Sequence, residues 1–256
     1  MTISGLRGGS GKSVTALNLS VSLSLYEKKV LLVDCDPQGC VSEWSGVTSL
    51  EYPFDLTSVL GGKANVFESI SKTEFAGLDI LPAGLNLFPL SLKLSRRPDN
   101  EKLLRLLMND VRGDYDFIIL DAPSSFGYLS VAALAAADWL VAAMAPRQGW
   151  IADFHDLLKT VQHIRQSHDI EMKMGGILFN RCNVKNEIFN GVSPGTFADA
   201  KPLIFDTTIP EDETVDLSLA KKTPLALYDI KTPAAQAYLD AARDVISEFK
   251  KNEVAD

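Results

Sequence analysis

The sequence predicts an α/β protein with a three-layer fold, in which helices cover both faces of a twisted, mostly parallel sheet. Short apolar runs rich in β-branched residues alternate along the chain with longer stretches of helical period, which is the pattern of βα units around a buried sheet. Several of these runs end in polar or acidic residues, as strands do at one edge of a parallel sheet. A length of 256 residues with 46% hydrophobic and 23% charged content fits one domain spanning residues 1–256.

The elements follow from this alternation of periods. We expect strands at residues 2–6, 30–34, 78–82, 116–121, 139–144, 173–180 and 203–209. We expect helices at residues 13–26, 101–111, 128–137, 151–166 and 232–249, the last with apolar residues recurring at spacings of three and four, so that one face packs on the sheet. Residues 85–100 carry two prolines and are expected to form an irregular surface segment. The polar end at residues 250–256 is expected to fray.

Composition excludes several classes of protein. No apolar run approaches the roughly 18 residues that would span a bilayer, so we expect a soluble, cytoplasmic protein. The three cysteines, Cys35, Cys40 and Cys182, form no CxxC pair, which argues against a disulfide framework or a zinc site. The net charge of −8 argues against a surface coated for nucleic acid, although a local basic patch on an acidic body can still bind phosphates.

A glycine-rich loop at residues 7–13 predicts phosphate binding. A strand runs into Arg7-Gly8-Gly9-Ser10-Gly11-Lys12-Ser13 and then into the helix expected at residues 13–26. This order lets backbone N–H groups and a helix N-terminus surround phosphate oxygens, and residues 8–14, up to Val14, are expected to bind the nucleotide. Lys12 is placed to contact the β- and γ-phosphates of ATP, and the Ser13 hydroxyl is placed to bind Mg²⁺. Leu6 stands where the strict G-x-x-x-x-G-K-[ST] pattern has its first glycine.

Carboxylates follow two of the expected strands. Asp34 and Asp36 come at the end of an apolar strand, and Asp121 ends the strand at residues 116–121. Because the carboxyl ends of parallel strands meet at the edge that carries the phosphate loop, these side chains are expected beside the triphosphate. There they can hold the waters of Mg²⁺ or orient an attacking water.

Together these segments resemble the deviant Walker A ATPases of the ParA/Soj/MinD group, whose loop is K-G-G-x-G-K-[ST]. The switch D-C-D-P-Q-G at residues 34–39 is similar to the family's D-x-D-P-Q-G, and Y-D-F-I-I-L-D-A-P at residues 115–123 is similar to Y-D-x-I-I-I-D-x-P. The resemblance covers nearly the whole chain and implies a P-loop NTPase fold. It implies that Asp36 orients the water, that Asp34 has a supporting Mg²⁺ or structural role, and that Asp121 contacts Mg²⁺ through water.

The loop departs from the family at one position. Arg7 stands where the family has a signature lysine that reaches across an ATP-sandwich dimer to the partner's phosphates. Arginine keeps the charge and has a planar fork suited to phosphate, with a different reach. The trans-acting cation is therefore Arg7, or else Arg147 in the loop after the strand at residues 139–144, which is equally well explained as a solvated loop residue.

The resemblance also implies the adenine site and the partners. Asn180 and Arg181 end a strand as in MinD-like relatives, and Pro210, Glu211 and Asp212 match a segment that lies along adenine. The resemblance also implies DNA binding through basic residues, for which the candidates are Arg181, Lys185, Lys201, Lys221, Lys222, Lys231, Lys250 and Lys251. Each of these is also explained as solvated charge.

The resemblance thus implies a slow, partner-stimulated ATP hydrolase that forms a homodimer with ATP and binds nucleoid DNA without sequence preference. A ParB-like or McdB-like adaptor would stimulate hydrolysis, and the cargo would be a plasmid, a chromosome region or a carboxysome. A MinD-like membrane-associated regulator of division is the alternative, although the acidic residues in the C-terminal tail make stable membrane association unexpected. A metallocluster-assembly ATPase would need paired cysteines near the second switch, and the sequence has none there.

Overall fold

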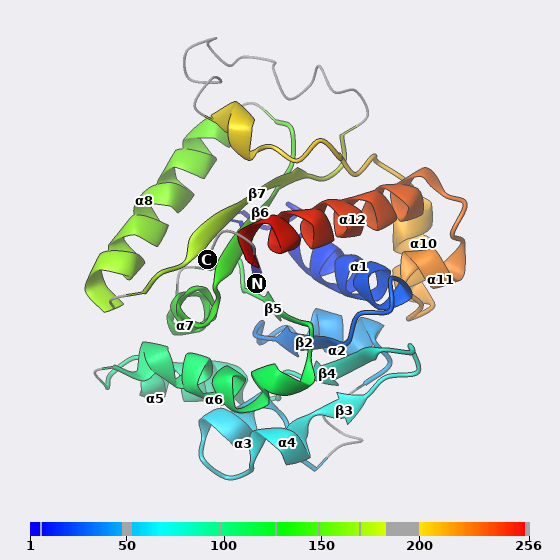
Figure 1. The fold of residues 1–256 in the computed structure, drawn as a ribbon. Helices are drawn as coiled ribbons and strands as arrows, with labels where there is room; N and C mark the ends of the chain where they lie inside the picture. The colour runs from blue at the N-terminus through cyan, green and yellow to red at the C-terminus, as the bar shows by residue number, and fades with distance from the viewer. Residues whose placement is uncertain are drawn as a thin grey trace.

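A computed structural model describes residues 1–5, 7–47, 53–97, 99–125, 127–147, 149–168, 170–182 and 200–253. Its centre is a seven-stranded sheet in the order β3-β4-β2-β5-β1-β6-β7 (Figure 1). All neighbouring strands are parallel except β3, which pairs antiparallel with β4. The strands are β1 (Thr2–Ser4), β2 (Val30–Asp34), β3 (Ser71–Lys72), β4 (Leu78–Leu81), β5 (Phe117–Asp121), β6 (Trp139–Met144) and β7 (Lys173–Phe179).

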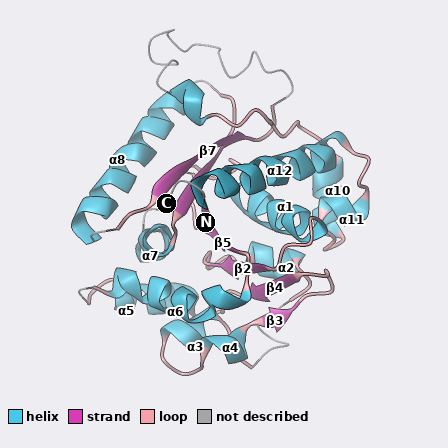
Figure 2. Cartoon of the chain, viewed as in Figure 1, coloured by secondary structure: helices cyan, strands magenta, loops and turns pink. Residues whose placement is uncertain are grey.

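Helices cover both faces of this sheet, as the sequence predicts (Figure 2). One face packs against α1 (Lys12–Leu25), α2 (Cys40–Trp44), α10 (Thr214–Ala220), α11 (Leu225–Tyr228) and α12 (Pro233–Glu253). The other face packs against α3 (Leu56–Leu60), α4 (Val66–Ser69), α5 (Leu87–Leu94), α6 (Leu103–Val111), α7 (Tyr128–Ala136) and α8 (Trp150–His168). Within the described residues the short 3₁₀ helices are η1 (Asn100–Lys102), η2 (Arg112–Asp114) and η4 (Lys201–Leu203).

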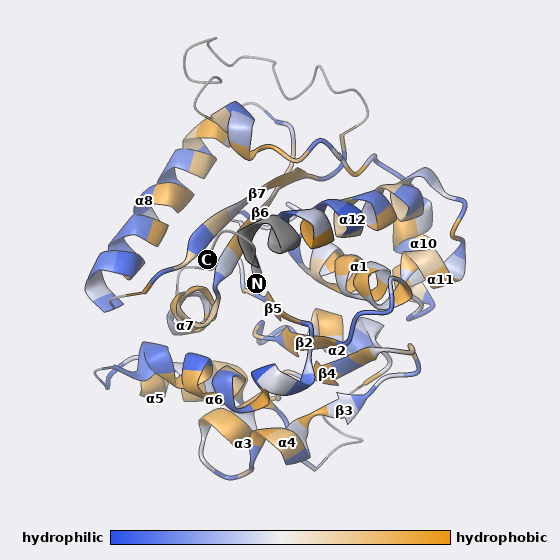
Figure 3. Ribbon diagram, in the orientation of Figure 1, coloured by the Kyte–Doolittle hydropathy of each residue, from blue (hydrophilic) through white to orange (hydrophobic). Residues whose placement is uncertain are grey.

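Two apolar cores lie on the two faces of the sheet. Along β2, Leu31 and Val33 belong to one core while Val30 and Leu32 belong to the other, because successive side chains of a strand point to opposite faces. A strand buried on both sides is therefore continuously apolar. The surface helices instead carry both hydrophobic and hydrophilic residues, as along α8 (Figure 3). No helix in the described part of the chain is long and apolar enough to cross a membrane.

The segment at residues 85–100 corrects one expectation. It contains α5, with Leu87, Ser91 and Leu94 buried at spacings of four and three. Pro89 falls in the first turn of this helix, where the N–H groups have no intrahelical partner, so the missing donor costs no helical hydrogen bond. Pro89 therefore marks a helix start here, and the expected irregular segment was wrong over residues 87–94.

The strand expected at residues 203–209 is also wrong. Its start falls in η4, and only one parallel bridge, between Ile177 and Ile204, joins it to β7. The backbone still follows β7 through a bond from Phe205 N to Ile177 O at 3.0 Å. The segment then turns toward α12, because the Thr207 hydroxyl donates to Asp244 at 2.7 Å.

The end of the chain differs from expectation in a smaller way. Helix α12 continues to Glu253, so the tail expected to fray from residue 250 is helical at its start. Residues 254–256 lie outside the described residues. The apolar face of α12 packs on α1, and its buried residues include Ala235, Tyr238, Ala242 and Val245.

Candidate functional site

The phosphate loop lies between β1 and α1, as expected from its sequence. Gly9 and Gly11 have φ angles of 78° and 85°, in the left-handed region where a Cβ is costly. Gly11 caps α1, and its carbonyl accepts the first helical bond from Thr15 N at 2.8 Å. A Cβ on Gly11 would stand 2.9 Å from Cγ of Asn180. Glycine is therefore required here by both backbone conformation and space.

Lys12 is held under this loop. Its side chain is buried, and Nζ donates to the Arg7 carbonyl at 3.0 Å. Burial lowers the pKa of Lys12, and the nearby Asp121 and Asp36 carboxylates oppose that shift. A cation so placed lies against the acidic edge of the sheet, where it can meet an incoming anion.

Asp121 lies at the centre of that edge. Its Cα pairs in register with Asp34 of β2, and the residue is 0% exposed. Burial, followed by the Asp34 charge, raises the pKa of Asp121 well above its usual value. Ser13 and Lys12 oppose this shift, yet neither carboxylate oxygen receives a hydrogen bond of normal geometry from the described residues. A buried carboxylate without such a bond is costly unless a cation or an ordered water contacts it.

Asp34 has structural bonds that Asp121 lacks. It accepts from the Ser42 backbone N–H at 2.8 Å, from the Ser42 hydroxyl at 2.6 Å and from Asp36 N at 3.1 Å. The same hydroxyl accepts from Ala83 N at 3.0 Å. Burial raises the pKa of Asp34 to about 6, against the opposing effect of the Ser42 bonds. Of the two roles expected for Asp34, these contacts favour the structural one.

Asp36 lies beyond the strand and is half-buried. Its Oδ1 accepts from Gln38 N at 2.9 Å, a local turn that leaves the other oxygen free of any bond within the described residues. The structure thus gives the two aspartates of the switch different surroundings. Asp34 fixes the backbone of the switch, and Asp36 is the carboxylate exposed to water.

Asn180 connects the loop to the core. Its Nδ2 donates to Ser10 O at 3.1 Å, and its Oδ1 accepts from the hydroxyls of Thr15 at 3.2 Å and Tyr238 at 3.1 Å. The amide expected to pair with adenine is therefore already bonded on both ends. Its position beside Gly11 instead fixes the spacing between the phosphate loop and β7.

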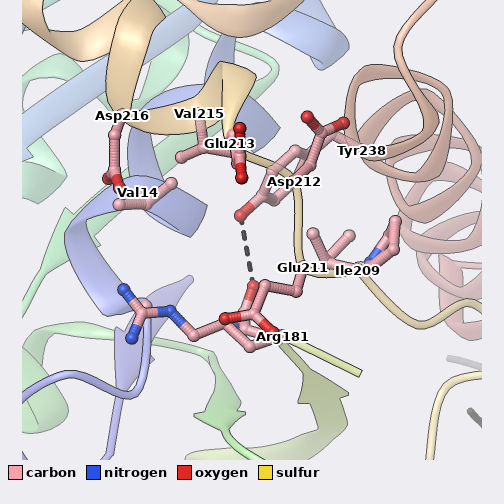
Figure 4. A pocket seen from close by; sticks show the side chains of 12 residues that line it. Val14, Arg181, Ile209, Glu211, Asp212, Glu213, Val215, Asp216 and Tyr238 are labelled. Carbon is pink, nitrogen blue, oxygen red and sulfur yellow. Dashed lines mark hydrogen bonds between the residues drawn. The ribbon is translucent and has the colours of Figure 1, made fainter. Parts of the chain in front are cut away.

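A cavity of about 540 Å³ opens beside the loop, a size typical of small-molecule sites. It brings together the expected adenine residues; its lining comprises Gly11, Val14, Asn180, Arg181, Ile209, Pro210, Glu211, Asp212, Glu213, Val215, Asp216 and Tyr238. In Figure 4, Arg181 lies across the cavity from Val215. Asp212 also bonds to the start of α10 through Thr214 N at 3.0 Å and to Ala234 N at 3.2 Å.

The two candidate arginines meet at one carboxylate. Arg7 Nε donates to Asp153 Oδ1 at 3.0 Å, and Arg147 Nη2 contacts Asp153 Oδ2. Asp153 lies in the first turn of α8. Sequence reasoning missed this residue, because an acidic residue in the first turn of a helix is a common stabilising feature and singles out no function.

The expected DNA-binding residues are spread over several elements. Arg181 follows β7, Lys201 lies in η4, Lys221 and Lys222 follow α10, and Lys231 precedes α12; all are exposed. Lys222 pairs with Glu43 at 3.7 Å, and Lys221 lies over the ring of Tyr228 at 5.5 Å. Lys185 lies outside the described residues, and nothing is described of the side chains of Lys250 and Lys251.

Comparisons with known proteins agree with this architecture. A family model described as an AAA domain matches residues 1–174. The chromosome partitioning protein ParA of Caulobacter vibrioides is 30% identical over 249 residues, which cover 96% of this chain and 93% of that protein.

Two solved structures show the same fold. Apo McdA from Cyanthece has a TM-score of 0.81 at 20% identity, over 96% of this chain and 98% of that one. The septum site-determining protein MinD from Pyrococcus horikoshii OT3, complexed with Mg-ADP, has a TM-score of 0.77 at 23% identity, over 95% and 94%. At these identities the structures establish a shared fold.

Proposed function

Because the chain belongs to the ParA/MinD superfamily of P-loop ATPases, we propose that it is a ParA-type positioning ATPase. It binds Mg·ATP on the loop at residues 7–13, forms a dimer with ATP at the interface, and moves or segregates a cargo. The cargo is a plasmid, a chromosome region or a carboxysome, and an adaptor carried on it, ParB-like or McdB-like, stimulates hydrolysis.

One observation carries the proposal at the level of the site. The buried carboxylate of Asp121 has no hydrogen bond of normal geometry from the described residues, and it lies beside Lys12 and Ser13. That combination fits Mg²⁺, which keeps several waters and is held by few protein groups together with phosphates.

Each residue of the site has a proposed role in binding or hydrolysing ATP. Backbone N–H groups of the loop and the N-terminus of α1 surround the phosphates, and Lys12 contacts the β- and γ-phosphates. Ser13 and Asp121 would hold Mg²⁺, which would supply positive charge beside the transferred phosphoryl group. Asp36 orients the attacking water. Because positioning by a carboxylate alone gives slow phosphoryl transfer, we expect a low rate without the adaptor.

The cavity beside the loop is the proposed adenine site. Val14, Pro210 and Val215 line it with apolar surface, on which a planar base can lie. Because the amide of Asn180 is already hydrogen-bonded, its proposed role is to hold the phosphate loop in position beside this cavity. Arg181 and the acidic residues Glu211, Asp212, Glu213 and Asp216 also line the cavity, and they are the proposed contacts for the polar edge of the base and for the ribose.

The proposed DNA contact is electrostatic. In the ATP-bound dimer, the exposed cations Arg181, Lys221, Lys222 and Lys231 bind phosphates of nucleoid DNA without sequence preference, so binding weakens as salt rises. We therefore propose that the protein lies in the cytoplasm on the nucleoid. Surface attachment to a membrane through α12 is disfavoured, because the apolar residues Tyr238, Ala242 and Val245 of that helix are buried against the core.

The proposal is tested on the Asp36→Ala variant, in which ATP should persist unhydrolysed. Light scattering with Mg·ATP should double the particle mass, whereas ADP should not, and the matched Lys12→Ala variant should stay monomeric. The ATP-loaded protein should be retained on random duplex DNA at low salt and released at high salt. A monomer under all nucleotide conditions contradicts the sandwich mechanism. Sedimentation with anionic liposomes and no DNA retention would instead support the MinD-like alternative.

A further inference from the structure

Three cationic side chains around the phosphate loop are linked in series. Lys12 Nζ donates to the backbone carbonyl of Arg7 at 3.0 Å, and Arg7 Nε donates to Asp153 at 3.0 Å. Arg147, which comes from the loop after β6, contacts the second oxygen of the same carboxylate. Arg7 is thus held at both ends, its backbone by Lys12 and its side chain by Asp153.

The carboxylate is well placed to hold two arginines. The Asp153 side chain is 11% exposed and lies in the first turn of α8, where the helix dipole stabilises a negative charge. Each arginine contacts a different oxygen, and bonds between charged groups are the strong ones. Two guanidinium groups share one carboxylate, so this group of three residues keeps one net positive charge.

Both arginines still present donors outward. Arg7 uses Nε, which leaves its two Nη groups without a bond in the described part of the chain, and Arg147 uses only Nη2. The side chains are 60% and 43% exposed. Because guanidinium binds phosphate through paired N–H groups, an exposed pair of this kind matches an anionic phosphate approaching from outside the subunit.

We propose that Asp153 is a positioning residue that fastens Arg7 and Arg147 into one arginine clamp for the phosphates of ATP held by the partner subunit. The clamp rests on the proposed function, since it needs a second nucleotide-bearing subunit. It removes the choice between the two arginines, because both act together. It also explains how an arginine serves at position 7: the longer, forked side chain is held by Asp153 in one orientation.

The clamp is tested in the Asp36→Ala background by measuring the protein concentration at half-dimerisation with saturating Mg·ATP. Asp153→Asn should raise this concentration roughly 10–100-fold, which corresponds to the free energy of one hydrogen bond between charged groups. Asp153→Glu, which keeps the charge, should recover most of the loss. Asp156→Asn is the matched control and should leave dimerisation unchanged. Asp156 lies on the same helix, and among the described residues its side chain pairs with the exposed Lys159.

A double-mutant cycle separates positioning from a merely structural role. In a chain that also carries Arg7→Ala and Arg147→Ala, Asp153→Asn should change half-dimerisation by less than about twofold, because the residue acts only through the arginines. Affinity of the monomer for a fluorescent ATP analogue should be the same in Asp153→Asn and its parent.

Two results overturn the clamp. One is an Asp153→Asn variant that dimerises like its parent, and the other is a shift that persists without the arginines. If the Asp36→Ala parent itself forms no ATP-dependent dimer, the proposed function is refuted instead.

Discussion

Replacing Gly11 with alanine tests whether the phosphate loop is built as described. At φ 85° an alanine is strained, at a cost of about 1–2 kcal/mol. Its Cβ would lie 2.9 Å from Cγ and 3.0 Å from Nδ2 of Asn180, so the amide must move. Asn180 then loses one or two of its bonds to Ser10, Thr15 and Tyr238, each contributing about 0.5–1.5 kcal/mol.

The combined cost is about 2–4 kcal/mol of the free energy of unfolding. For a chain of this size about 2–4 °C of melting temperature corresponds to each kcal/mol, so Gly11→Ala should lower the melting temperature by roughly 5–15 °C. The assay is thermal unfolding followed by far-ultraviolet circular dichroism without nucleotide, which separates the stability effect from any loss of ATP binding.

Gly8→Ala is the matched control on the same loop. Gly8 lies outside the left-handed region, and its added Cβ would meet no atom within 4 Å. Its unfolding free energy should stay within about 0.5 kcal/mol of the parent. The reasoning is refuted if Gly11→Ala and Gly8→Ala have the same melting temperature, because neither the strain nor the contact with Asn180 would then exist.

Three further predictions concern the switch and the cavity. Ser42→Ala removes the hydroxyl that Asp34 and Ala83 share and should destabilise the protein by about 1–3 kcal/mol, measured by urea unfolding; an unchanged midpoint would count against a structural Asp34. Cys40 is the only half-buried thiol of the three, so a maleimide should label it before Cys35 and Cys182, as peptide mapping would show; equal labelling would contradict the described burial.

Asp212→Ala should cost about 1 kcal/mol through the lost bonds at the start of α10. Burial acts to raise the pKa of Asp212, but hydrogen bonds from Thr214 and Ala234 outweigh it and lower the pKa. The stabilisation is therefore fully present above the ordinary value of 3.8 and is lost as pH falls through the lowered pKa. If the difference between variant and parent stays constant down to that lowered pKa, the predicted role of Asp212 is wrong.

The sequence by itself indicated most of the strands and the long helices and predicted the residues of a phosphate site, but it did not indicate β3 or the short helices α2, α3 and α4. Six expected strands and five expected helices appear near their predicted bounds. They could be predicted because the hydrophobic period and the polar residues at strand ends depend only on residues close together in the sequence. Lys12, Ser13 and Asp121 lie at the same edge of the sheet, as expected, because the carboxyl ends of parallel strands share one edge.

Only the tertiary structure decided which partner each polar group finds. The sequence left Arg7 and Arg147 as alternatives, and the fold brings both to Asp153, a residue 146 positions from Arg7. It also placed Asn180 against Ser10 of the loop, 170 positions away along the chain, rather than free in the cavity. Contacts between residues so far apart along the chain depend on packing, which local patterns do not encode.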